Sequence, residues 1–106
     1  MNETVTYIAP IKLATGVTEA QLLEESARFQ AEFASKEPGI LRRELIRKAE
    51  GQYMDIVLFR SEKDALEVIE KEQSSTVCQA FFALMDVSAD PDMADMGPFP
   101  SLAVYE

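Results

Sequence analysis

The segment 39–60, GILRRELIRKAEGQYMDIVLFR, constrains the fold more than any other part of the chain. It predicts two strands joined by a tight turn at Glu50-Gly51, because glycine adopts a positive φ at little cost. Alternation along the second strand, 53–60, places Met54, Ile56 and Leu58 on one face and Tyr53, Asp55, Val57 and Phe59 on the other. Neither face is simply polar, so we expect both to be covered, one by helices and the other by a second copy of the chain.

The segments before the hairpin predict a strand and a helix. Alternation over 3–13 indicates a strand, with a bulge or a sheet edge at Pro10, which has no N–H to donate. Thr18 and Gln21 form a capping-box pattern, and the helix that they begin is expected to run to about Lys36.

The segments after the hairpin complete a β-α-β-β-α-β order. Ser61 begins a short helix, and a further helix covers 75–85 after a polar break, unless the two form one kinked helix. We expect a loop over 86–100 and a last strand over 101–106. This order is typical of a ferredoxin-like α+β domain, so residues 1–106 are interpreted as one domain with helices on one face of an antiparallel sheet.

Composition narrows the classes of partner. The chain has 106 residues and a net charge of −9, which argues against nucleic acid or an anionic membrane, because both attract basic surfaces. The first residues lack a signal-peptide pattern, and no apolar run approaches the length of a membrane span. We therefore expect a soluble, cytoplasmic protein.

The chain contains no histidine, which removes the commonest general base and the commonest metal ligand together. Its carboxylates lack the spacing of a calcium loop. We therefore expect no metal ion, no haem and no organic cofactor.

The chain resembles the antibiotic biosynthesis monooxygenase family of small dimeric α+β barrel proteins. The resemblance is carried by TVTYIAPIKL, ATGVTEAQLL, EPGILRRELIRKAEGQYMDIVLFRSEKDAL and CQAFFALMD. It implies a ferredoxin-like subunit whose sheet packs against a second sheet in a homodimeric barrel, with a pocket between the sheet and the helices of each subunit.

The residues that carry chemistry in the family are missing here. The asparagine, tryptophan and histidine of its haem-degrading branch fall near Ala9, Val68 and Cys78. The quinone-forming oxygenases of the family also use asparagine and tryptophan, but the only asparagine is Asn2, and Phe59 stands where a strand-end tryptophan is frequent. The resemblance therefore implies the fold and leaves the catalytic residues unknown.

Seven residues are candidates for binding a small apolar or aromatic ligand: Tyr7, Phe29, Phe33, Arg43, Met54, Cys78 and Phe82. Tyr7 is expected to face the helices, where its phenol either binds a substrate oxygen or only completes the core. The phenylalanines and Met54 line a pocket or form plain core.

Arg43 and Cys78 each have a functional and a structural interpretation. Three arginines, Arg42, Arg43 and Arg47, either bind an anionic ligand or pair at the surface with Glu44, Glu50 or helix carboxylates. Alternation places Arg43 and Arg47 on one strand face and Arg42 on the other. Cys78 is a reactive thiol only if a cation or a helix N-terminus stabilises the thiolate, and its apolar neighbours favour a structural role.

Two functions remain open at this point. The first is cofactor-independent oxidation of an electron-rich substrate by oxygen, with an oxyanion stabilised by Tyr7 or an arginine. The alternative is a non-catalytic, dimeric module that binds a small molecule or is associated with stress. In both, we expect a homodimer that a charged residue at Val57 or Phe59 dissociates or unfolds.

Overall fold

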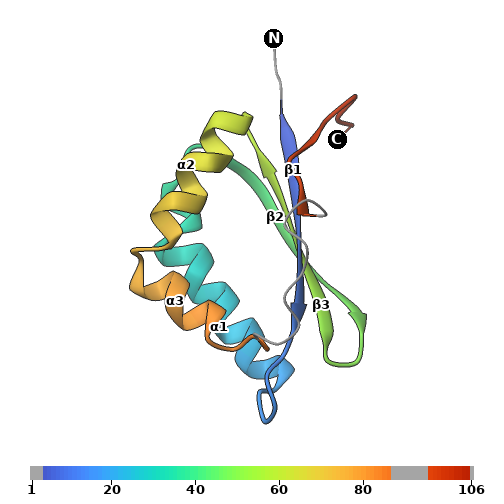
Figure 1. Cartoon of the computed structure of the whole chain (residues 1–106), viewed down its shortest axis with the longest axis vertical. Coiled ribbons are helices and arrows are strands. Elements are labelled where there is room, and N and C mark those ends of the chain that lie inside the picture. Colours follow the sequence, from blue (N-terminus) through green and yellow to red (C-terminus); the bar gives the residue numbers. More distant parts are fainter. Residues whose placement is uncertain (1–3, 87–95, 106) are drawn as a thin grey trace.

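The computed structural model describes residues 4–86 and 96–105, which form an α+β fold with all helices on one side of a four-stranded sheet (Figure 1). The elements are β1 (Val5–Lys12), α1 (Glu19–Glu32), a 3₁₀ helix (Ala34–Lys36), β2 (Ile40–Ala49), β3 (Gln52–Phe59), α2 (Glu62–Glu72), α3 (Thr76–Phe82) and β4 (Phe99–Pro100). The strand order is β2-β3-β1-β4 and every pair is antiparallel, which confirms the predicted fold class.

The first helix begins where the capping box was predicted. The Thr18 side chain accepts a hydrogen bond from the Gln21 N–H at 3.2 Å, and the Gln21 side chain accepts one from the Thr18 N–H at 2.8 Å. The helix ends at Glu32 rather than near Lys36, because Phe33 leaves helical backbone geometry and a 3₁₀ turn follows. The expected C-terminal boundary was therefore one turn too late.

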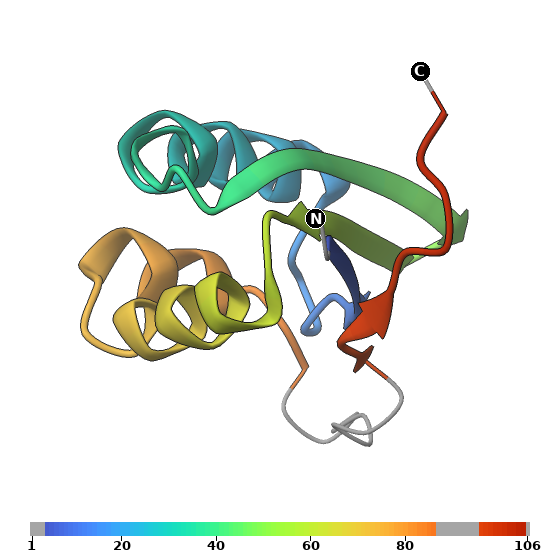
Figure 2. The same ribbon diagram turned by 90° about the horizontal axis from the view of Figure 1, so that it is seen from above.

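The second helical segment is two helices, not one kinked helix. Ser61 and Ser75 each accept a hydrogen bond from the backbone N–H three residues later, Asp64 at 3.1 Å and Cys78 at 3.4 Å. Figure 2 shows α1 and the pair of α2 and α3 side by side on the same side of the sheet. Among the described residues, no helix has the length and apolarity needed to cross a membrane.

The last strand was predicted in the wrong place. β4 consists of Phe99 and Pro100, which pair with Thr6 and Val5 of β1, whereas the described part of the predicted strand, 101–105, is not a strand. Pro98 and Pro100 have no N–H for a ladder, which keeps this pairing short. Most of the loop expected over 86–100 lies outside the described residues.

The two faces of β3 are in different environments. Tyr53, Asp55 and Phe59 are buried on the face toward the helices, and Val57 lies on that same face. Met54, Ile56 and Leu58 are half-buried on the opposite face, which no described helix covers. Val57 and Phe59 were therefore wrong choices for testing contact between two sheets, because alternation directs them into the subunit's own core.

The core lies between the helix-side face and the helices, and Leu22, Cys78 and Phe81 are its largest fully buried side chains. Phe29 of α1 contacts Phe33 and Phe81, at ring-centroid distances of 5.4 and 5.1 Å. The contact with Phe81 links α1 to α3 within the helix layer.

We expect Leu22→Ala to lower the free energy of unfolding by about 2–5 kcal/mol, because Leu22 is fully buried and alanine leaves a cavity. Urea denaturation followed by circular dichroism measures the change. Leu23→Ala is the matched control, since Leu23 is 55% exposed and its loss should change stability by less than about 0.5 kcal/mol. Equal losses in the two variants would contradict this packing of α1.

Candidate functional site

A cavity of about 530 Å³ lies between the helix-side face of the sheet and the helices. This volume is within the range of roughly 300–1,000 Å³ that is common for small-molecule sites. Its lining is mainly apolar: Ala9, Ile11, Phe29, Val57, Phe59, Val68, Phe81, Phe82 and Met85. The cavity is therefore suited to a small apolar molecule.

Aromatic rings form much of the cavity wall. Phe29 of α1 lies 5.1 Å from Phe81 and 6.4 Å from Phe82, measured between ring centroids. On the sheet side, Tyr7 meets Phe59 edge to face at 5.6 Å. Burial, and to a lesser extent the charge of Glu62, raises the pKa of the Tyr7 phenol, so this group is a neutral hydroxyl at neutral pH.

A buried ion pair lies against this aromatic wall. Arg43 of β2 binds Asp55 of β3 through Nε, at 3.3 Å from each carboxylate oxygen, and through Nη2, at 3.0 Å from Oδ2. Nη2 also donates to Ser26 and Nη1 donates to Gln30, both at 3.1 Å and both on α1. The Arg43 guanidinium lies 4.6 Å above the centre of the Phe29 ring, which adds a cation–π contact.

Arg43 is therefore not the free cation that an anionic ligand requires. Its side chain is 7% exposed and that of Asp55 is 8% exposed, so the two charges neutralise each other away from water. Burial raises the pKa of the Asp55 carboxyl, and the Arg43 charge opposes this shift. The surface pairing predicted for the three arginines is present for Arg42 with Glu44 and for Arg47 with the helix carboxylate Glu19. Arg43 differs, because its partner is the buried Asp55.

Glu72, in the last turn of α2, is a cavity residue that the sequence interpretation missed. Burial raises the pKa of its carboxyl to about 7, with the charge of Asp55 adding to the rise and that of Arg43 opposing it. A helical signal was available, because Ala65, Val68 and Glu72 follow i, i+3, i+7 spacing and so share one face. Asp55 was also not identified as a site residue, although its alternation with Tyr53 and Val57 places it on the core face.

The seven predicted ligand residues separate into two groups. Tyr7, Phe29, Arg43 and Phe82 line the cavity, whereas Phe33, Met54 and Cys78 do not. Phe33 packs on Phe29, and Met54 lies on the outer face of the sheet.

Cys78 is fully buried beside the cavity wall and does not line it. Burial raises the pKa of its thiol, which favours the structural interpretation of this residue. Ala9 and Val68, at two positions where the resemblance implies functional side chains, do line the cavity with small apolar ones.

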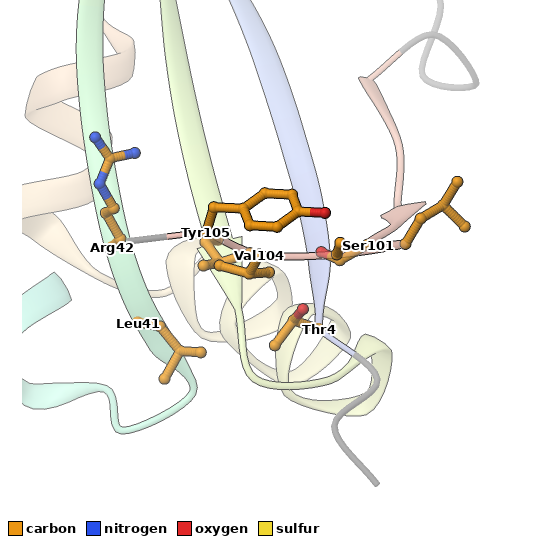
Figure 3. A pocket seen from close by; sticks show the side chains of 9 residues that line it. Thr4, Leu41, Arg42, Ser101, Val104 and Tyr105 are labelled. Carbon is orange, nitrogen blue, oxygen red and sulfur yellow. The ribbon is translucent and has the colours of Figure 1, made fainter.

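A second hollow, of about 1030 Å³, lies on the outer face of the sheet. Figure 3 shows the segment 101–105 crossing the strands there, with Thr4, Leu41 and Arg42 beside it. Leu41 is 51% exposed and Tyr105 is 91% exposed, so this hollow is open to water and does not enclose a small molecule. Within the described ranges, no group of three or more histidine, cysteine, aspartate or glutamate side chains is placed to hold a metal ion.

We expect Asp55→Asn to lower the free energy of unfolding by about 3–5 kcal/mol, because it leaves the buried Arg43 charge without a counter-charge. Chemical denaturation at neutral pH measures the loss. Glu44→Gln removes the partner of the exposed Arg42 and should cost about 1 kcal/mol or less. Similar losses for both variants would show that the Arg43–Asp55 pair is not buried in solution.

No protein-family profile and no curated protein matches the chain significantly. Solved structures do match it. SnoaB, a cofactor-independent oxygenase from Streptomyces nogalater, is 21% identical, with a TM-score of 0.66 over 79% of this chain and 85% of its own. A putative antibiotic biosynthesis monooxygenase from Nitrosomonas europaea is 20% identical, with a TM-score of 0.59 over 86% of this chain and 85% of its own.

A third similar structure is a putative antibiotic biosynthesis monooxygenase from Caulobacter crescentus CB15, 19% identical, with a TM-score of 0.59 over 79% of this chain and 80% of its own. Identities near 20% support the fold and leave the activity open. The resemblance indicated by the sequence is thus confirmed in the structure, and the chain has the α+β fold of the antibiotic biosynthesis monooxygenases.

Proposed function

We propose that the chain binds a small, apolar or aromatic molecule in the cavity and oxidises it with molecular oxygen, without a metal ion or an organic cofactor. The observation that carries the proposal is a cavity of about 530 Å³ with an aromatic wall and one compact charged cluster. The structural similarity to SnoaB, a cofactor-independent oxygenase, supports this class of reaction.

The cavity supplies what such a reaction requires of a protein. An electron-rich aromatic substrate itself provides the electrons that reduce oxygen, so the protein has only to orient it, limit water and stabilise developing negative charge. The rings of Phe29 and Phe82 offer flat surfaces for orientation. Tyr7 offers a neutral hydroxyl as a hydrogen-bond donor. Gln30 accepts one of the two N–H groups of the Arg43 Nη1 atom, which leaves the second as a further donor.

We expect the chain to consume oxygen with at least one member of a panel of phenols, naphthols and hydroquinones in the presence of a chelator. Ala9→Phe should lower kcat/KM by at least about tenfold, because the larger ring occupies the cavity that Ala9 lines. An oxygen electrode measures both rates.

Ala27→Phe is the matched control, since it adds the same ring to the exposed side of α1. This variant should retain the activity of the unmodified chain. Binding of a panel member that Ala9→Phe abolishes, with no oxygen uptake by the unmodified chain, would support the non-catalytic binding module instead.

We further propose that the chain is a homodimer in which the outer faces of two sheets pack together. Ile8, Met54, Ile56 and Leu58 make that face apolar, and no described helix covers it. Leu102 and Tyr105 are almost fully exposed in the segment that crosses the same face (Figure 3). A second copy would remove these apolar groups from water, which at about 25 cal/mol per Å² is a strong drive for association.

We expect the unmodified chain to sediment as a dimer at micromolar concentration and Ile56→Glu to sediment as a monomer. Ile56 lies mid-strand between Ile8 and Glu44, so the new carboxylate would be buried unpaired in the interface. Leu66→Glu places the same charge on an exposed position of α2 and should stay dimeric. A monomeric unmodified chain would refute the proposed dimer.

A further inference from the structure

Three carboxyl groups among the described residues line the cavity: those of Asp55, Glu72 and Asp86. Asp55 is held by Arg43, and Asp86 lies 3.9 Å from the Lys12 ammonium. In contrast, no side chain in the described ranges donates a hydrogen bond to the Glu72 carboxyl or forms an ion pair with it. Of the described lining residues, Glu72 is thus the carboxylate that no cation holds and that is available to accept a proton.

The surroundings of Glu72 come from three elements. Arg43 on β2 and Asp55 on β3 are the charged groups that act on it, and the thiol of Cys78 on α3 is the nearby titratable group. The Arg43 and Asp55 charges cancel, so the electrostatic state of the cluster follows the protonation of Glu72. The rest of the nearby wall is apolar, with Val68, Ile69 and Phe81 in the cavity lining.

We propose that Glu72 is the base that accepts the proton of an aromatic hydroxyl group on the substrate. The inference rests on the proposed function and assigns its proton-transfer step. The raised pKa of the Glu72 carboxyl, to about 7, supports this role, because a general base is most effective when its pKa lies near the working pH.

Charge conservation favours the transfer. Before it, the cluster of Arg43, Asp55 and ionised Glu72 carries one net negative charge beside a neutral substrate. After it, Glu72 is neutral and the substrate oxygen carries that charge. Because the cavity gains no net charge, the transfer avoids the cost of creating a new ion in an apolar site.

The overall reaction is balanced with oxygen as the oxidant. For 1-naphthol, the naphtholate reduces oxygen and forms a C–O bond at the para carbon, and the peroxide then takes a proton back from Glu72. Loss of the ring C–H proton and cleavage of the O–O bond release water and leave 1,4-naphthoquinone. The substrate gives four electrons, one oxygen atom enters the product and the other leaves as water, and Glu72 returns to its starting state.

The test uses 1-naphthol with the unmodified chain, Glu72→Gln and Glu70→Gln. Oxygen uptake measured from about pH 5 to 9 should give a kcat/KM for the unmodified chain that rises through about pH 7 and then levels, because the ionised carboxylate is the active form. Glu72→Gln should lose about 100-fold in kcat/KM together with this rise. Glu70→Gln, on the exposed side of α2, should keep both.

A second measurement does not depend on oxidation. Photoexcited 1-naphthol is a strong acid, so under anaerobic conditions the ligand bound to the unmodified chain should emit as naphtholate, and the ligand bound to Glu72→Gln should emit as neutral naphthol. If Glu72→Gln loses the naphtholate emission but the unmodified chain consumes no oxygen, the oxidation is refuted and Glu72 is still supported as the proton acceptor. Unchanged uptake, pH profile and emission in Glu72→Gln would overturn the inference while leaving the proposed function standing.

Discussion

The buried pair of Arg43 and Asp55 is the interaction on which the arrangement of sheet, helix and cavity depends. It joins β2 to β3 and, through Ser26 and Gln30, joins both strands to α1. Burying two charges costs free energy unless their hydrogen bonds are satisfied, and here four of the five guanidinium N–H groups have acceptors. The pair therefore contributes less to net stability than to fixing the position of α1 over the sheet.

The same pair sets the chemistry available in the cavity. Because Arg43 is engaged by Asp55, it offers little net positive charge to a ligand, and an anionic molecule would meet a site that already holds Glu72. A neutral aromatic molecule avoids that repulsion and gains contact with the ring of Phe29. These charges thus disfavour a carboxylate or a phosphate as a ligand of the cavity.

The sequence was sufficient for features that depend on local patterns. Alternation along β3 separated Tyr53 from Met54, and the Thr18–Gln21 capping box marked the start of α1. It was insufficient where the outcome depends on contacts between distant segments. The partner of Arg43 lies twelve residues away, diagonally across the hairpin, and the short β4 depends on where the chain returns to β1. Periodicity predicts which face a side chain occupies, but not the partner that it meets there.

The cavity itself results from side-chain size rather than from backbone geometry. Ala9 on β1 and Val68 on α2 face it with small side chains, at positions where the resemblance implies larger, functional ones. Space remains between the sheet and the helices where both facing side chains are small. The small side chains of Ala9 and Val68 therefore leave room for a ligand, and Glu72 is the carboxylate of the described lining that has no ion-pair partner.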